Sequence, residues 1–191
     1  YGAIGRTEEA KATLERALRL SKEMGDREYE SYSLSQMGRI HLLSGEPLKA
    51  IDYLRESLAI EWARQDHSQL APRLNEMASA YSYLGLYEDA EITLTEAERH
   101  IGPSGQRDQL AYNLRIKSKI SLARGDFETS DRSLSRASEL YRELMMPSNV
   151  AWVKSALAAS LGMRGAFSTA EKLLEEAVGT LNEVQDQFRL A

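Results

Sequence analysis

Small and large apolar residues follow one another along the chain at the spacing of an α-helix. Ala50 is followed by Leu54 after four residues and by Ser57 after three more. Positions i, i+4 and i+7 lie on one helical face, and small side chains there let another helix approach closely. The pattern predicts an amphipathic helix that packs through a row of small, large and small residues.

This row returns at intervals of 40 residues, and each copy is preceded by a glycine. The glycines are Gly5, Gly45, Gly85, Gly125 and Gly165; the first small residues are Ala10, Ala50, Ala90, Ser130 and Ala170; the leucines are Leu14, Leu54, Leu94, Leu134 and Leu174; the second small residues are Ala17, Ser57, Ala97, Ala137 and Ala177. A period of this length indicates a solenoid, in which helix hairpins stack because no hairpin covers its own apolar face.

Each of these glycines is expected to end one helix in the left-handed conformation before the next helix begins. Signals for a helix start come just after them. Pro47 fits the first helical position and Asp126 can cap the helix that follows it, and Thr7 or Ser168 could act in the same way. The glycines therefore predict tight turns inside helix hairpins.

Turn-forming stretches also separate one hairpin from the next, as at 146–148. The first helices of the hairpins are expected at 28–44, 68–84, 108–124 and 149–164. The second helices are expected at 7–23, 47–64, 87–101, 127–145 and 167–184. The chain is interpreted as one array over 1–191, with a partial unit at about 1–26, full units at 27–66, 67–106, 107–146 and 147–186, and the start of a further helix.

The repeated residues resemble the tetratricopeptide repeat (TPR) over the whole chain. The best matches are Met77-Ala78, Tyr81, Leu84-Gly85, Tyr87, Ala90, Leu94 and Ala97, and good ones are Met37-Gly38, Gly45, Pro47, Ala50 and Leu54. Lys117, Ser118 and Ser130 depart from the family pattern. The resemblance implies an all-α, right-handed superhelical solenoid of antiparallel helix hairpins. The period of 40 residues is longer than the usual 34. In this length the repeats are similar to those of bacterial LuxR-type regulators and polarity adaptors.

Composition and charge narrow the possible functions. The 191 residues carry a net charge of -5 with both signs interspersed, unlike the basic surface of a nucleic-acid binder. The absence of cysteine excludes disulfides and thiol catalysis, and it fits a reducing compartment, so the cytoplasm is expected. No apolar run is long enough to span a membrane.

The resemblance implies that first helices line a concave wall that binds an extended peptide or a partner's helix. Helical spacing selects a candidate partner-binding stripe on them: Tyr32, Ser35, Arg39, Asn75, Ser79, Tyr112, Arg115, Lys119, Trp152 and Ser155. Its basic members could pair with carboxylates, and its aromatic members could supply contact area. In the alternative interpretation the aromatics pack against the next hairpin and the charges are only solvated.

Nothing in the sequence predicts a catalytic site, a cofactor or a metal. His41, His67 and His100 fall at different positions of the repeat, and no pair has the spacing of a helical metal site. No phosphate-binding loop, zinc-protease helix or serine-hydrolase elbow is present. The glycine-rich segment 102–105 follows a helix and is interpreted as a longer connection.

The leading functional hypothesis is a non-enzymatic scaffold that binds a protein or peptide partner with acidic groups. The alternative is a regulatory segment of a signalling or transcription regulator that senses a ligand or peptide. Residues 1–4 align with the tail of a first helix and residues 188–191 with the start of another, so the chain is expected to be part of a larger protein. Exposed solenoid ends could then self-associate.

Overall fold

The computed structural model describes residues 2–64, 67–101 and 106–190, and the side chains within 7–64, 67–101 and 106–185. These residues form nine α-helices, one short 3-10 helix and no strand. The prediction of an all-α fold is therefore confirmed. None of the helices in the described ranges is long and apolar enough to cross a membrane.

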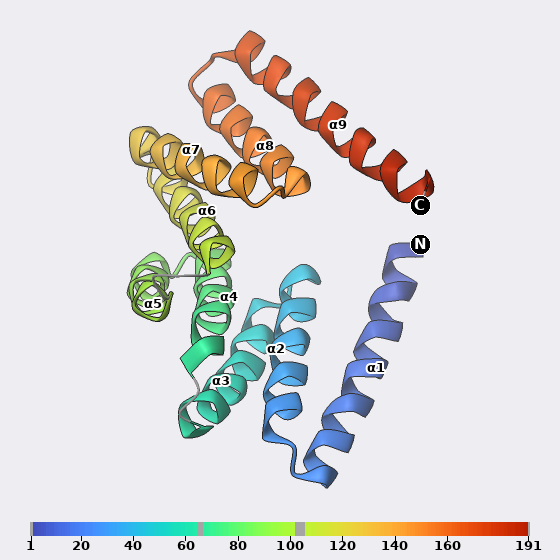
Figure 1. Cartoon of the computed structure of the whole chain (residues 1–191). Helices are drawn as coiled ribbons and strands as arrows, with labels where there is room; N and C mark the ends of the chain where they lie inside the picture. Colours follow the sequence, from blue (N-terminus) through green and yellow to red (C-terminus); the bar gives the residue numbers. More distant parts are fainter. Residues whose placement is uncertain (1, 65–66, 102–105, 191) are drawn as a thin grey trace. The chain divides into compact units, whose positions relative to one another are not determined.

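The chain divides into two compact units, an N-terminal unit over 1–100 and a C-terminal unit over 101–191. The N-terminal unit contains α1 (Gly2–Met24), α2 (Arg27–Leu43), α3 (Pro47–Arg64), the 3-10 helix η1 (His67–Gln69), α4 (Leu70–Tyr83) and α5 (Tyr87–His100). Helix α1 packs against α2, and α2–α3 and α4–α5 form antiparallel hairpins that meet through α3 and α4 (Figure 1).

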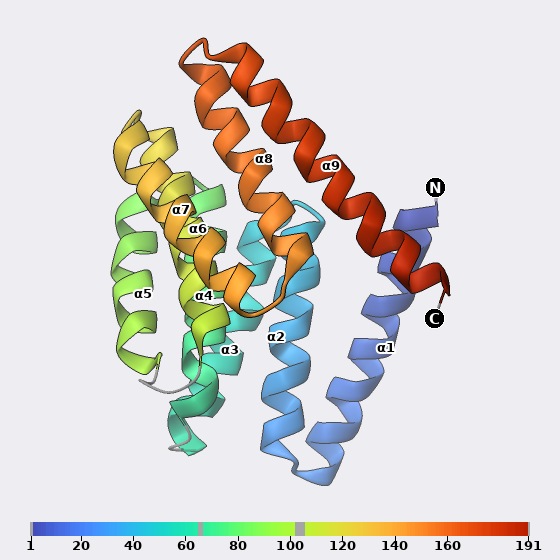
Figure 2. The same ribbon diagram turned by 45° about the horizontal axis from the view of Figure 1, so that its top comes forward.

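The C-terminal unit contains α6 (Arg107–Ala123), α7 (Phe127–Glu143), α8 (Pro147–Met163) and α9 (Phe167–Leu190). Helices α6 and α7 form one hairpin and α8 and α9 form the next, and the two meet where α7 packs on α8 (Figure 2). We call α2, α4, α6 and α8 the first helices of their hairpins, and α3, α5, α7 and α9 the second helices.

The turn between α2 and α3 shows how a hairpin closes. Gly45 has a φ of +74°, a left-handed value that only glycine adopts without strain. Its N–H donates to the Leu42 carbonyl at 3.1 Å, and the Glu46 N–H donates to the His41 carbonyl at 2.8 Å. These two hydrogen bonds satisfy carbonyl groups in the last turn of α2. Left-handed glycines also stand in the other three hairpin turns, as predicted, at Gly85, Gly125 and Gly165.

The prediction is wrong at the start of the chain. Helix α1 runs unbroken from Gly2 to Met24, so Gly5 lies inside it and Thr7 does not cap it. A single glycine costs a helix only about 1 kcal/mol, and the neighbouring residues favour helix. The left-handed glycine comes instead at Gly25, where α1 ends.

The expectations for the two chain ends are corrected in the same way. Residues 2–4 begin α1 rather than ending an earlier helix, and residues 188–190 continue α9 rather than opening a new one. Tyr1 and Ala191 lie outside the described residues, as does the segment 102–105.

Two predicted helix starts are confirmed, and a third differs. Pro47 is the first residue of α3, and the Asp126 carboxylate accepts a hydrogen bond from the Thr129 N–H at 3.0 Å at the start of α7. Helix α8 begins at Pro147, two residues before the predicted start, because proline is favoured in a first helical turn.

Most of the repeated small and leucine positions lie in the core of their unit, whereas Leu174 on α9 is 46% exposed. In the N-terminal unit Leu54 packs with Leu70, Leu74 and Ala97. In the C-terminal unit Leu134 and Ala137 belong to an equivalent cluster with residues of α6 and α8, including Ala111 and Val153. The row read from the sequence is therefore the packing row.

The serines that depart from the family pattern are accommodated. Ser118 and Ser130 are 2% and 0% exposed. The Ser118 hydroxyl donates to the Arg115 carbonyl at 2.7 Å, whereas the Ser130 hydroxyl has no hydrogen-bond partner in the described part of the chain. Both serines therefore serve as small packing residues.

Candidate partner-binding surface

The predicted stripe is distributed over all four first helices. In the N-terminal unit α2 carries Tyr32, Ser35 and Arg39, and α4 carries Asn75 and Ser79. In the C-terminal unit the members are Tyr112, Arg115 and Lys119 on α6, and Trp152 and Ser155 on α8. Each unit therefore contributes residues from two successive first helices.

In the C-terminal unit three of these side chains meet. The Arg115 Cζ lies 3.7 Å from the centroid of the Trp152 ring and 5.3 Å from that of the Tyr112 ring. A guanidinium at such distances is attracted by the negative faces of the rings. Trp152 remains 41% exposed, and the other two side chains are half-buried. We call these three residues the arginine–aromatic cluster.

The positive charge of this cluster is not neutralised within the C-terminal unit. The Arg115 Nε is buried without a hydrogen-bond partner, and no carboxylate in the described ranges forms an ion pair with Arg115. Lys119 follows one helical turn later on the same helix, and burial lowers the pKa of its ammonium group. The Nζ of Lys119 is buried, so Arg115 carries the positive charge of this surface and Lys119 lies close to it along α6.

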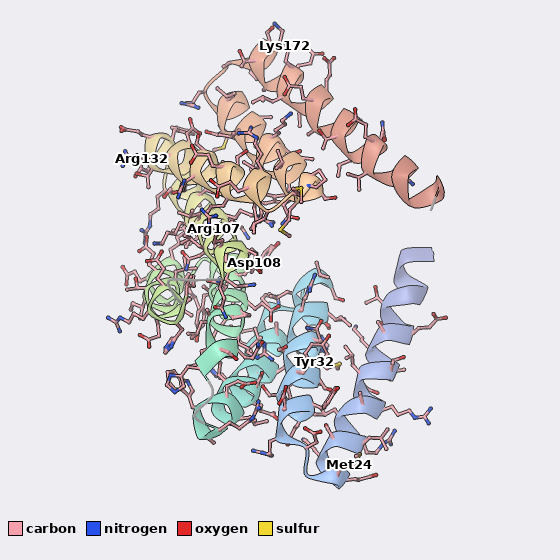
Figure 3. All side chains as sticks on the ribbon, in the orientation of Figure 1. Met24, Tyr32, Arg107, Asp108, Arg132 and Lys172 are labelled. Atoms are coloured by element: carbon pink, nitrogen blue, oxygen red, sulfur yellow. The ribbon has the colours of Figure 1, made fainter. Side chains whose placement is uncertain are left out.

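On its first helices the N-terminal unit combines a tyrosine, two arginines and a glutamate. Tyr32 is 51% exposed and Arg39 is exposed on α2, and the partly buried Glu76 on α4 interacts electrostatically with Arg39 and Arg73. Burial raises the pKa of Glu76 to about 7, and the two arginines oppose that shift. The pKa of Arg73 is lowered, chiefly by burial. Figure 3 shows Tyr32 on α2.

Some predicted members are not available to a partner. Ser35 and Asn75 are only 1% and 0% exposed. The Ser35 hydroxyl donates to the Tyr32 carbonyl at 3.0 Å. Ser155 is half-buried, and its hydroxyl donates to the Ala151 carbonyl at 3.1 Å. The candidates with exposed or half-buried side chains are Tyr32, Arg39, Ser79, Tyr112, Arg115, Lys119, Trp152 and Ser155, and among these the Nζ atom of Lys119 is itself buried.

Sequence reasoning did not identify a buried polar network in the N-terminal unit. Glu61 is 1% exposed on α3, accepts a hydrogen bond from Ser31, and has Arg64 at 3.2 Å and Arg73 at 3.7 Å. The sequence held a signal for this network, because Glu61 stands at a position where the later repeats have large hydrophobic side chains. These are Ile101, Tyr141 and Leu181.

The histidines lie apart from this surface. His67 and His100 have ring centroids 5.5 Å apart, and each contacts the edge or face of Trp62. His41 is buried and stacks on Tyr53 with a centroid distance of 5.2 Å. Within the described ranges, no group of three or more histidine, aspartate or glutamate side chains could hold a metal ion.

Comparison with known proteins finds a family match over the first part of the chain. Residues 1–60 match the family model described as tetratricopeptide repeat. No curated protein matches the chain significantly.

Solved structures match nearly the whole chain. BtubC (BKLC) from P. vanneervenii is 18% identical with a TM-score of 0.73, and the match covers 96% of this chain and 76% of that one. The nearly identical TPR-like repeats described as a kinesin light chain from Podosopora anserina are 17% identical with a TM-score of 0.61, covering 97% and 92%. MamA is 14% identical with a TM-score of 0.59, covering 96% and 97%. At these identities the structures establish the fold alone.

Proposed function

We propose that this chain, whose residues 1–60 match the tetratricopeptide repeat and whose fold is that of TPR-like solenoids, is a protein- or peptide-binding scaffold. Its binding surface is the exposed face of the first helices. The observation that carries the proposal is the convergence of Tyr112, Arg115 and Trp152 from two successive first helices. Tyrosine, tryptophan and arginine are the residues most enriched at the energetic centres of protein interfaces.

The proposed partner presents acidic groups. Arg39, Arg115 and Lys119 give the stripe a positive character on a protein whose net charge is -5. Local complementarity of this kind selects a partner and orients it, while the overall negative charge disfavours nucleic acid. We propose binding without catalysis, in a reducing compartment such as the cytoplasm, which the cysteine-free sequence fits.

A double charge reversal tests this proposal. Arg115→Glu with Lys119→Glu should abolish or greatly weaken partner capture, because two attractive charges four residues apart on α6 become repulsive. The measurement is affinity capture with the purified protein, followed by calorimetry on the recovered partner. Circular dichroism checks that the variant is folded.

A matched control comes from the second helix α7. Arg132 and Arg136 have the same spacing, are exposed, and form only surface ion pairs with Glu128 and Glu139. Arg132→Glu with Arg136→Glu should leave capture unchanged. Full capture by the folded Arg115 and Lys119 variant would place the partner elsewhere.

A further inference from the structure

We propose that Arg115 is the anchor of the partner-binding surface and that it binds a carboxylate of an acidic peptide segment, while Trp152 and Tyr112 hold its guanidinium in place. This inference rests on the proposed function. It adds which residue makes the main contact with the partner, and which chemical group of the partner that residue binds.

The geometry leaves the donors of Arg115 usable. At 3.7 Å from the Trp152 centroid, the Cζ is in contact with the face of the ring. A guanidinium carries its N–H groups in its own plane, so stacking on an aromatic ring does not consume them. A carboxylate can therefore accept two parallel hydrogen bonds from Arg115 while the ring contact is kept.

The surroundings of Arg115 differ from those of other cations in the C-terminal unit. Arg164 lies 2.5 Å from Asp131, Arg107 lies 2.7 Å from Glu143, and Lys154 lies 2.8 Å from Glu176. Arg115 has no such carboxylate in the described part of the unit, and its Nε is buried without an acceptor. The buried Nε is out of a partner's reach, so the terminal N–H groups of the guanidinium are the donors that a partner's carboxylate would accept from.

Contacts with two aromatic rings also prepare Arg115 for binding. Ordering a long side chain at an interface costs conformational entropy, and that cost falls when the side chain is already held. Lys119 lies one turn away with its Nζ buried, so it can add positive potential near Arg115, while Arg115 is the residue that contacts the partner. A single stacked arginine matches the single charge and planar shape of a carboxylate, whereas phosphate groups are recognised by clusters of arginines.

Trp152 makes a direct assay available. The chain has two tryptophans, so a Trp62→Phe background leaves Trp152 as the sole indole reporter. The probe is a peptide of three Glu-Ala repeats with blocked ends, and the control is its Gln-Ala counterpart. We expect a saturable change in Trp152 emission with the acidic peptide, weakened by 0.5 M salt, and no saturable change with the control.

Arg115→Lys separates anchoring from charge. Lysine keeps the charge but loses the planar fork, so affinity for the acidic peptide should fall roughly tenfold or more. Arg132→Lys, on the exposed surface of α7, should leave the affinity within about twofold, because exposed charges contribute little.

Trp152 acts here as a positioning residue, and calorimetry tests it without the fluorescence signal. Trp152→Leu should weaken peptide binding, and Trp152→Phe should restore most of it, because phenylalanine retains an aromatic face for the guanidinium. Equal weakening by leucine and phenylalanine would contradict this role.

Several outcomes would overturn the inference: no saturable response, an equal response to both peptides, an unchanged affinity for Arg115→Lys, or a stronger response to inorganic phosphate. Failure here is distinguishable from failure of the proposed function. If partner capture still depends on Arg115 and Lys119 but acidic peptides are not preferred, the proposed scaffold function is retained and the proposal that Arg115 binds a carboxylate is wrong. If capture is unaffected by the double charge reversal, the scaffold surface itself is wrong.

Discussion

Gly38 lies on α2 in close contact with α3. A Cβ at this position would stand 2.8 Å from the Leu54 Cγ and 3.2 Å from the Ala50 carbonyl oxygen. Leu54 is 0% exposed, so the core gives it little room to move. Gly38→Ala should therefore destabilise the protein by about 1–3 kcal/mol, because overpacking outweighs the better helix propensity of alanine.

Gly179 on α9 provides the matched control for Gly38. A Cβ there would meet nothing within 4 Å. Gly179→Ala should stabilise α9 by up to about 1 kcal/mol through helix propensity alone. Urea unfolding of both variants measures the difference, and stabilisation by both substitutions would refute the close contact of α2 with α3.

Glu76 makes stability depend on pH. Its folded-state pKa is raised to about 7 from 4.5, so between these values the folded protein holds a proton that the unfolded chain has released. The contribution of Glu76 to stability is thus fully present below pH 4.5 and is lost as the pH rises through 7.

The expected loss from Glu76 is up to about 3 kcal/mol. Glu76→Gln should flatten the stability curve over this window, measured by urea unfolding at a series of pH values. Glu46 does not interfere, because hydrogen bonds from Lys49 and His41 lower its pKa to about 2. An identical slope in the natural protein and in Glu76→Gln would show that Glu76 titrates normally.

Residue-level prediction succeeded where it depended on helical spacing and failed where it depended on tertiary partners. Spacing alone placed Tyr112, Arg115 and Trp152 on first helices, and the structure brings them together. Spacing could not reveal that Ser35 and Asn75 are buried, because burial depends on how closely neighbouring helices approach.

At the scale of a helix, the packing row can be tested on α5. Ala90 is 0% exposed at the first small position of this helix. Ala90→Arg should destabilise the N-terminal unit by about 3 kcal/mol or more, because it overpacks a close contact and buries a charge. Thermal unfolding measures the effect.

Ile92, two residues away on the same helix, serves as the control because it is 69% exposed. Ile92→Arg should change stability by less than about 0.5 kcal/mol, as surface substitutions usually do. Equal melting temperatures for the Ala90 and Ile92 variants would refute the assignment of the packing face.

Helix boundaries were predictable where a chemical signal stands beside the repeat. Glycine at Gly45 and proline at Pro47 enclose the turn before α3, and both act locally through fixed backbone preferences. Gly5 has the same place in the repeat, but it lies inside α1 and no turn forms there. The 3-10 helix at His67–Gln69 follows no periodic signal and could not be anticipated.

At the scale of the whole molecule, the recurring row explains how each unit is held together, and the first helices carry what differs between them. The N-terminal unit presents an acid facing two arginines, and the C-terminal unit presents an arginine between aromatics. The boundary between the units falls at His100 and Ile101, next to the glycine-rich segment 102–105 of the sequence. Periodicity alone does not mark that boundary, because the row of small, large and small residues recurs with the same spacing on both sides of it.

Site-specific photo-crosslinking tests the central claim most directly. A benzophenone amino acid replaces Tyr32 or Ser79 on the first helices of the N-terminal unit, or Arg132 on the second helix α7 as the control, in cells that contain the natural partner. Figure 3 shows Tyr32 and Arg132. The account predicts adducts with the same partner polypeptide from the two first-helix positions and none from position 132. Adducts from position 132 alone, or equal yields from all three positions, would contradict it.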